Sequence, residues 1–242
     1  MNAGTRVLLT GGTGLLGQEL APLLGDVVAP PRAALDVLLP ETIAAAIRRE
    51  RPKVLVHAAA YTDVAGAESE RALAWATNVD GTRNVALACR DADVLLVHVS
   101  TDYVFDGQRG GYREDDTPGP PINHYALTKI AAEAVARCAP RHLVLRTSFR
   151  PRKWPYARAY TDVVTSQDYV DVIAPMLAAV VRRASELDFD TLHVGTEPKT
   201  VHALARRRQP AVGRASRSEA AVRLPADISL DTRRYAERFG PG

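Results

Sequence analysis

Cysteine and long apolar runs are scarce in this chain of 242 residues. Its two cysteines, Cys89 and Cys138, fall in predicted helices without metal-ligand spacing, so we expect packed free thiols rather than a disulfide. No apolar run approaches the roughly 20 residues that span a bilayer, and residues 1–6 lead into an apolar strand without the pattern of a signal peptide. No cluster of His, Cys, Asp and Glu has ligand spacing. The sequence thus predicts a cytoplasmic protein with no metal site and no membrane contact.

Lysine is also scarce, because only four of the 31 basic residues are lysines. A lysine at a defined position then indicates that a compact ammonium is needed there, which applies best to Lys129. The net charge is only +3, but residues 151–242 hold 15 basic and 11 acidic residues. This excess is either a solvated face or a surface that meets an anionic substrate. No recognition motif for nucleic acids accompanies it, so we expect no nucleic-acid partner.

A glycine-rich turn follows the first apolar segment, a short buried strand predicted over residues 5–10. Its three glycines are Gly11, Gly14 and Gly17. We expect the first to allow a tight turn, the second to let backbone approach a pyrophosphate, and the third to permit close helix packing. Leu15 and Leu16 begin a helix predicted over residues 15–24, whose N-terminus offers free N–H groups to phosphates. Strand, turn and helix together predict a dinucleotide site.

The end of the second predicted strand, residues 26–29, bears on the choice of cofactor. A site for NAD usually places an acidic residue here to hold the ribose hydroxyls, and none is present. Arg32 is either a surface charge or the partner of the 2′-phosphate of NADP. Asp36 and Val37 follow where a loop can cross the adenine. We therefore expect NADP as the preferred cofactor, with NAD as the alternative.

Two further strands are predicted, over residues 54–56 and 94–99, joined through a long helix over residues 67–90. The first is followed by His57, expected to be a satisfied histidine at the strand end, and by three small residues against which a flat cofactor can lie, Ala58, Ala59 and Ala60. The second is followed by Ser100 and Thr101. Since open α/β sheets place their chemistry at the carboxyl ends of strands, Thr101 is a candidate site residue.

Tyr125 and Lys129 lie four residues apart at the start of another predicted helix and so share one face of it. Because an ammonium beside a phenol favours the phenolate, we expect Lys129 to lower the pKa of Tyr125 toward the range of a general acid or base. Such a pair suits carbonyl reduction or alcohol oxidation. Taken alone, the spacing is more often that of a half-buried aromatic residue beside a solvated charge.

Short apolar strands and amphipathic helices alternate as far as residue 149, with a strand over residues 143–145. This alternation predicts an α/β protein with a Rossmann-type doubly wound parallel sheet. Residues 150–160 are rich in arginine, proline and aromatic residues without periodicity. We therefore expect a dinucleotide-binding Rossmann domain over residues 1–150 and a small substrate-binding part over residues 151–242 that partly returns to the sheet. Further elements are predicted over residues 168–183, 191–194, 200–208 and 231–239.

Several of these motifs together resemble one family, the extended short-chain dehydrogenase/reductases of the dTDP-4-dehydrorhamnose reductase (RmlD-like) branch. The resemblance is continuous over about residues 5–149 and returns at residues 223–234. Its most specific blocks are Ala-Ala-Ala-Tyr-Thr over residues 58–62 and Ser-Thr-Asp-Tyr-Val-Phe-Asp-Gly over residues 100–107. The other matching residues are the glycine-rich turn, residues 67–70, Asn78, Tyr125, Lys129 and Glu133.

This resemblance implies a reductase of a keto group on a nucleotide-linked sugar, with NADPH or NADH as cofactor. Tyr125 would give the proton, Lys129 would lower its pKa and hold the nicotinamide ribose, and Thr101 would bind the carbonyl oxygen. Asn78 and Ser100 would join the cofactor site. The substrate side would comprise Thr62, Val64, Tyr103 and Phe149. Homodimers are common among relatives, which makes a homodimer the assembly to test.

The chain departs from the family after its fifth predicted strand. Phe149 replaces the usual tryptophan that would face the sugar, and residues 150–160 replace the usual Tyr-Gly and the helix after it. Three hypotheses follow: a nucleotide-sugar reductase, a reductase of another carbonyl compound in specialised metabolism, or a non-catalytic dinucleotide-binding regulatory subunit. The intact Thr101, Tyr125 and Lys129 argue against the third.

Overall fold

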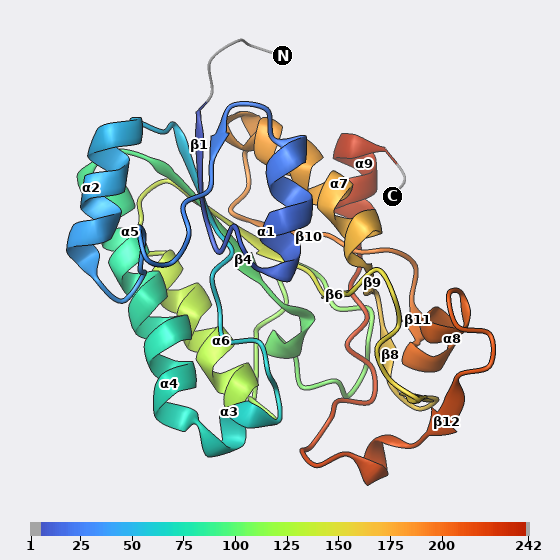
Figure 1. Ribbon diagram of the computed structural model, residues 1–242. Coiled ribbons are helices and arrows are strands. Elements are labelled where there is room, and N and C mark those ends of the chain that lie inside the picture. The colour runs from blue at the N-terminus through green and yellow to red at the C-terminus, as the bar shows by residue number, and fades with distance from the viewer. Residues whose placement is uncertain (1–5, 241–242) are drawn as a thin grey trace.

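A parallel sheet of six strands forms the centre of the protein (Figure 1), whose structure is a computed structural model describing residues 6–240. From edge to edge the strands are β10 (Thr191–His193), β5 (His142–Arg146), β4 (Leu95–Ser100), β3 (Val54–His57), β1 (Val7–Thr10) and β2 (Val27–Val28). Every neighbouring pair is parallel. The predicted α/β class and Rossmann-type sheet are therefore confirmed. The predictions for residues 1–5 lie outside the described residues.

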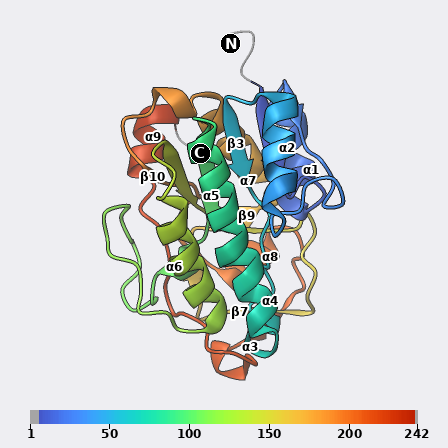
Figure 2. The ribbon, with the colours of Figure 1, turned by 90° about the vertical axis from the view of Figure 1, so that its left-hand side faces the viewer.

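Helices cover both faces of the sheet, because successive side chains along a strand point to opposite faces. In β1, Val7 and Leu9 pack in one core with α1 (Leu15–Leu20) and α7 (Val170–Arg182). Leu8 points the other way, into a core with α2 (Pro40–Glu50) and α5 (Gly81–Asp91). In Figure 2, α6 (His124–Ala136) runs beside α5 on this second face. The last helix, α9 (Arg233–Phe239), belongs to the first core.

The single long helix predicted over residues 67–90 is wrong at Glu70, where the chain interrupts it. Between α3 (Gly66–Ser69) and α4 (Arg71–Trp75), Glu70 has φ −105° and ψ 43°, which is not helical. Its carboxylate accepts a hydrogen bond from the Tyr61 hydroxyl at 2.5 Å, which holds the break against the loop after β3. A π-helical turn, Ala76–Asp80, then leads into α5. Inserted π turns of this kind are frequent at functional sites.

The C-terminal half adds three two-stranded ladders that the sequence did not predict. They are β6 (Phe149–Arg150) with β9 (Asp168–Tyr169), β7 (Arg158–Tyr160) with β12 (Gly213–Ala215), and β8 (Val164–Thr165) with β11 (Lys199–Thr200). The short helix α8 (Val201–Arg206) follows β11. Strands of two or three residues are too short to show an alternating pattern. The chain also contributes β10 to the main sheet beside β5. Its division near residue 150 stays a prediction.

Both cysteines are free, as the sequence predicted. Cys89 is buried in α5. Cys138 lies in the turn after α6 and is exposed, so the expectation of two packed thiols in helices is wrong for this residue. The helix ends at Ala136, two residues before Cys138.

A buried ion pair fixes α6 to the carboxyl ends of the central strands. Glu133 of α6 accepts hydrogen bonds from Arg146 Nε at 3.0 Å and from Arg146 Nη2 at 2.9 Å. The Ser100 hydroxyl, at the end of β4, donates to the same carboxylate at 2.6 Å. The Glu133 and Arg146 side chains are only 4% and 2% exposed. This pair therefore sets the position of the helix that carries Tyr125 and Lys129.

Replacing Glu133 with alanine is expected to lower the free energy of unfolding by about 3–5 kcal/mol, because Arg146 would remain buried without a counter-charge. Urea denaturation at pH 7 measures the change. Glu186→Ala is the matched control, since Glu186 pairs with Arg183 at the surface and its loss should cost less than about 1 kcal/mol. Equal effects of the two substitutions would contradict the structural role of the buried pair.

Candidate active site

A cleft of about 550 Å³ runs along the carboxyl ends of the parallel strands. It includes the point where β2 and β3 leave β1 on opposite sides, which is where open α/β sheets bind ligands. The lining begins at the loop after β2, with Arg32, and extends to the segment after β5, with Phe149 and Tyr156. Thr101, Tyr125 and Lys129 lie between these ends.

The cleft brings together every site residue predicted from the sequence except Asn78. Those in its lining are Gly11, Gly14, Leu15, Leu16, Gly17, Arg32, Asp36, Val37, Ala58, Ala59, Ala60, Thr62, Val64, Ser100, Thr101, Tyr103, Tyr125, Lys129 and Phe149. They come from segments as far apart as residues 11 and 149, so the fold and not the sequence makes them neighbours. Their individual roles stay predictions.

The glycine-rich turn is shaped by close backbone contacts. Gly11 has φ +72°, and a Cβ there would lie 2.7 Å from Ala59 N. A Cβ on Gly17 would lie 2.2 Å from Gly11 O. Gly14 is exposed, and a Cβ there would meet, among residues 6–240 and apart from its chain neighbours, only Gly11 O, at 3.2 Å. The first and third glycines are thus required by the turn, whereas the second leaves backbone open toward the cleft.

Arg32 and Asp36 form an exposed ion pair at the β2 end of the cleft, with Arg32 Nε 3.1 Å from Asp36 Oδ2. The backbone N–H of Leu38, which donates to Asp36, and the neighbouring Arg32 hold the pKa of Asp36 below its usual value. The Arg32 side chain is 71% exposed. An exposed pair of this kind is weak, so Arg32 can exchange Asp36 for a stronger anion.

Thr101 is held by a buried carboxylate that the sequence analysis did not single out as a site residue. Thr101 Oγ1 donates to Asp102 Oδ1 at 3.1 Å, and Thr165 Oγ1 donates to Asp102 Oδ2 at 2.9 Å. Burial raises the pKa of Asp102 to about 6, against these two hydrogen bonds. Asp102 belongs to the sequence block over residues 100–107, so the sequence could have indicated it as a site residue. Its partner Thr165 could not be found in this way, because it belongs to β8, 63 residues further along the chain.

Burial raises the pKa of Tyr125, whereas the sequence predicted that Lys129 would lower it. That prediction is wrong for this structure, because a buried phenolate loses its hydration and the opposing hydrogen bond comes from Thr101. The Nζ of Lys129 donates instead to the backbone oxygen of Val99 at 3.0 Å. Burial lowers the pKa of Lys129 to about 8, while Glu133 acts in the opposite direction. Tyr125 is therefore a protonated phenol at neutral pH.

Asn78 lies behind the cleft, in the π-helical turn. Its Oδ1 accepts a hydrogen bond from Tyr61 N at 2.7 Å, and its Nδ2 donates to Tyr61 O at 3.1 Å and to Thr128 Oγ1 at 2.9 Å. It thereby joins the loop after β3 to the helix of Tyr125. Its predicted contact with a cofactor stays a prediction.

His57, the last residue of β3, has the structural role expected from the sequence. Its Nδ1 lies 2.8 Å from Thr10 Oγ1 and its Nε2 lies 3.0 Å from Thr82 Oγ1. Both ring nitrogens therefore have hydrogen-bond partners. The prediction of a satisfied histidine at a strand end is confirmed.

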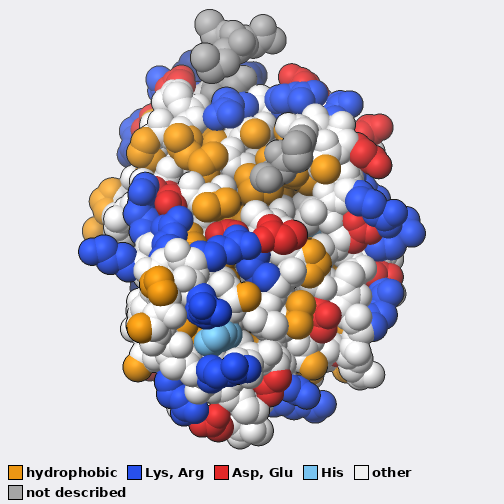
Figure 3. All heavy atoms as spheres, turned by 90° about the vertical axis from the view of Figure 1, so that its right-hand side faces the viewer, with side chains coloured by type: hydrophobic (Ala, Val, Ile, Leu, Met, Phe, Trp, Pro, Cys, Tyr) orange, Lys and Arg blue, Asp and Glu red, His pale blue; other side chains and the backbone are white. Residues whose placement is uncertain are grey.

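Further residues line the cleft that the sequence analysis did not single out: Thr13, Pro30, Leu35, Leu38, Thr77, Val99, Thr147, Ser148, Arg150, Pro151 and Tyr156. Arg150 and Tyr156 belong to the stretch without periodicity, so only their position after β5 indicated them. The arginines of the basic second part, Arg206, Arg207, Arg208, Arg214 and Arg217, lie outside the lining. Figure 3 shows basic side chains spread over one face with acidic ones among them.

No helix within residues 6–240 is both long and apolar enough to cross a bilayer. Over the same part of the chain, no three or more His, Cys, Asp and Glu side chains gather in a metal-binding arrangement.

A family model described as the RmlD substrate binding domain matches residues 5–165. The chain belongs to this family. Among curated relatives, a dTDP-4-dehydrorhamnose reductase from Streptomyces griseus is 44% identical over 132 residues, which are 53% of this chain and 43% of that protein. One from Burkholderia thailandensis is 35% identical over 72% of this chain and 60% of that protein. The chain thus spans about half the length of the curated relatives it matches.

Solved structures resemble the chain of this RmlD-family protein over nearly its whole length. A dTDP-4-dehydrorhamnose reductase from Bacillus anthracis, in complex with NADP, superposes with a TM-score of 0.87 at 27% identity, over 97% of this chain and 93% of that chain. A hypothetical dTDP-4-dehydrorhamnose reductase from Sulfolobus tokodaii gives 0.85 at 30% identity, over 98% and 95%. The second half, rewritten in sequence, therefore keeps the arrangement of these structures.

The lowered pKa of Lys129 predicts a stability difference at alkaline pH. The pKa of Lys129 is about 8 in the folded chain and 10.5 is its ordinary value. Between these two pH values the unfolded chain keeps a proton on Lys129 that the folded chain has lost. The free energy of unfolding of the wild type should therefore rise, relative to Lys129→Met, by about 1.4 kcal/mol for each pH unit in this window. Urea denaturation of both proteins at pH 7.5 and pH 10 gives the difference. Lys53→Met, at an exposed position, should show no such change.

Proposed function

We propose that this RmlD-family protein is an NAD(P)-dependent oxidoreductase of the short-chain dehydrogenase/reductase type, which reduces a keto group on a nucleotide-linked sugar. The observation that carries the proposal is one cleft that joins the glycine-rich turn to Thr101, Tyr125 and Lys129. The names of the relatives from Streptomyces griseus and Burkholderia thailandensis support the same reaction. The relative from Streptomyces niveus is a dTDP-4-keto-6-deoxy-D-glucose reductase, which supports a dTDP-linked substrate class.

The residues of the cleft fit a nicotinamide dinucleotide. The exposed backbone at Gly14 leaves space that a larger residue would fill, and backbone N–H groups there suit a pyrophosphate. Arg32 is exposed and supports NADP as the preferred form, as does the NADP complex of the Bacillus anthracis relative. A nicotinamide cofactor held there would supply the hydride to the keto carbon.

The protein's own part in the reaction is to place and protonate the carbonyl oxygen. Tyr125 holds its proton at neutral pH, because burial raises its pKa, and so it can give that proton to the oxygen as negative charge develops there. Thr101 would turn its one hydroxyl hydrogen from Asp102 Oδ1 to the same oxygen and so keep that oxygen beside the phenol. The buried ammonium of Lys129 stabilises the negative charge of this step and holds the nicotinamide ribose.

The substrate side of the cleft comprises Thr62, Val64, Tyr103 and Phe149. In this proposal residues 1–150 bind the cofactor, residues 151–242 form the substrate-binding part, and Asn78 supports the cofactor side through Tyr61 and Thr128. A homodimer and a cytoplasmic location stay predictions.

A second candidate function is reduction of another carbonyl compound of specialised metabolism. It is favoured by one observation, the replacement of the family's usual tryptophan and the helix after it by Phe149 and residues 150–160. Both candidates use the same Tyr125, Thr101 and Lys129. A panel of nucleotide-linked keto sugars and neutral ketones, added to the protein with NADPH, separates them.

Tyr125→Phe is expected to lower the rate of NADPH oxidation with a dTDP-4-keto sugar by about 10²–10⁴-fold, because it removes the proton donor. Binding of NADPH should change less than about twofold, since the ring remains in place. Absorbance at the NADPH band and a fluorescence titration measure the two quantities. Tyr235→Phe, in α9, is the control and should leave both unchanged. An active Tyr125→Phe variant would contradict the proposal.

Arg32→Ala is expected to weaken NADPH binding about tenfold and to change NADH binding less than about twofold, because only NADPH carries the 2′-phosphate. Titration of each cofactor into each protein gives the dissociation constants. Arg90→Ala is the matched control, since Arg90 also forms an exposed ion pair, with Asp91, but lies outside the cleft. Equal loss of both cofactors would show that Arg32 does not read the phosphate.

A further inference from the structure

Arg150 is the one arginine in the lining at the substrate end of the cleft. It ends the short strand β6, directly after Phe149, in the stretch where the sequence departs from its family. The other arginine of the lining is Arg32, at the opposite end after β2. The two guanidinium groups are therefore separated along the cleft by Thr101 and Tyr125.

Arg150 forms no ion pair within the part of the chain that the structure describes. No carboxylate there lies within ion-pair distance of its guanidinium, and its buried Nε has no hydrogen-bond partner. The neighbouring arginines are all paired: Arg152 with Glu19, Arg158 with Glu219, Arg207 with Asp168 and Arg208 with Asp171. A partly buried cation without an anion is costly, so a ligand that supplies one gains free energy.

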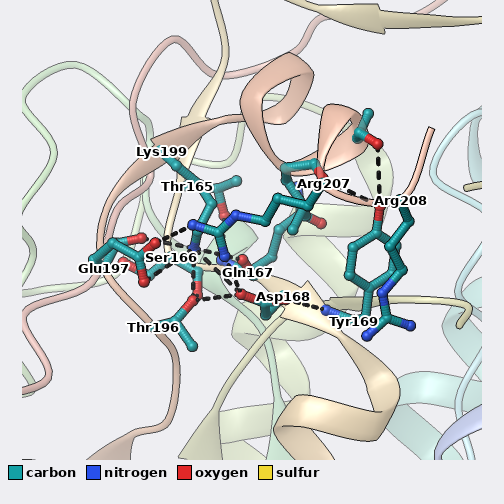
Figure 4. A network of polar contacts seen from close by, with 12 residues as sticks. Thr165, Ser166, Gln167, Asp168, Tyr169, Thr196, Glu197, Lys199, Arg207 and Arg208 are labelled. Atoms are coloured by element: carbon teal, nitrogen blue, oxygen red, sulfur yellow. Dashed lines mark hydrogen bonds and ion pairs between the residues drawn. The ribbon is translucent and has the colours of Figure 1, made fainter. Parts of the chain in front are cut away.

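The strand that pairs with β6 is part of a polar network, shown in Figure 4. Phe149 and Arg150 pair with Asp168 and Tyr169 of β9 through their backbones. The Asp168 carboxylate accepts hydrogen bonds from Arg207 Nη1 at 3.0 Å and Thr196 Oγ1 at 3.1 Å, and Lys199 Nζ lies 3.7 Å away. The Arg208 guanidinium lies 3.9 Å from the centre of the Tyr169 ring. This network fixes the strand that carries Arg150 and leaves the Arg150 side chain unpaired.

The surroundings of Arg150 place its charge on the substrate side. Its guanidinium lies 5.8 Å from the centre of the Trp154 ring, which supports it by a cation–π contact. Tyr156, 53% exposed, meets the same ring edge-on at 5.5 Å and lines the cleft. Burial raises the pKa of Asp102 and Tyr103, and the charge of Arg150 opposes both shifts. Arg150 therefore lies near the residues that flank the carbonyl site.

We propose that Arg150 binds the diphosphate of the nucleotide-linked substrate. A guanidinium presents parallel N–H groups that match phosphate oxygens two at a time, and its contact with Trp154 holds it ready. The phosphates of the cofactor have their own place at the glycine-rich turn after β1. The proposal rests on the proposed function and extends it, because it assigns the recognition of the substrate's anionic group to a residue in the rewritten segment.

The test is calorimetric titration of the full chain, saturated with NADP⁺, with thymidine diphosphate and with thymidine. Arg150→Met should weaken binding of thymidine diphosphate at least about tenfold and leave thymidine unchanged. Arg150→Lys should recover part of the loss, because it keeps the charge without the planar fork. Arg158→Met is the matched control, since Arg158 is in the same half of the chain but pairs with Glu219 outside the cleft. Raising the salt concentration should weaken the wild type more than Arg150→Met.

Titration of NADPH into the same variants separates this proposal from the proposed function. If the wild type binds NADPH and thymidine diphosphate and Arg150→Met binds both normally, the role of Arg150 is overturned while the reductase proposal stands. If Arg150→Met loses NADPH instead, Arg150 serves the cofactor and the proposal is wrong. If the wild type does not bind NADPH, the reductase proposal fails, and the thymidine diphosphate titration without cofactor still decides the role of Arg150. Absence of thymidine diphosphate binding to the wild type would also overturn it.

Discussion

The buried ion pair between Glu133 and Arg146 is the constraint on which the cleft depends. Arg146 ends β5 and Ser100 ends β4, and both bond to one carboxylate on α6. Since Tyr125 and Lys129 lie about two turns and one turn before Glu133 on that helix, the ion pair fixes their position relative to Thr101, which follows Ser100. Arg146 Nη1 also lies 3.3 Å from His193 Nε2, so β10 joins the same anchor. The chemistry of the cleft therefore rests on a polar contact beneath it.

Burial acts on the two ionisable residues of the proposed reaction in opposite directions, because one is an acid that becomes charged on losing a proton and the other a base that becomes charged on gaining one. It raises the pKa of Tyr125 and lowers that of Lys129 to about 8. The phenol thereby keeps its proton until a more basic alkoxide forms beside it. Glu133 opposes the shift of Lys129, so the residue that positions α6 also helps to keep the ammonium charged. Glu133 therefore influences both the position of Lys129 and its protonation state.

The sequence predicted the Rossmann half well, because that half is specified locally. Gly11 predicts a turn from its residue type, and its φ of +72° is one that favours glycine. The strands β1, β3, β4 and β5 each contain an apolar run. The break at Glu70, the ladders of two or three residues and the partner of Asp102 were missed, because they depend on contacts with distant segments. The pKa of Tyr125 was predicted in the wrong direction for the same reason. The four-residue spacing places Tyr125 and Lys129 on one face of the helix, but only the fold shows how deeply both side chains are buried.

The rewritten segment after β5 explains how one scaffold can keep its reaction and alter its recognition. Phe149 and Arg150 belong to a strand that pairs with β9, and β9 is held by the Asp168 network together with α8 and Lys199. Nothing in that network touches Tyr125, Thr101 or Lys129 directly, but it reaches Thr101 through Thr165 and Asp102. A change of side chain at residue 149, 150 or 156 therefore alters the proposed substrate wall of the cleft while Tyr125, the proposed proton donor, stays in place. That wall carries the Arg150 guanidinium beside the Trp154 ring and without an ion pair among residues 6–240, which is why the proposed substrate is one that brings a negative charge.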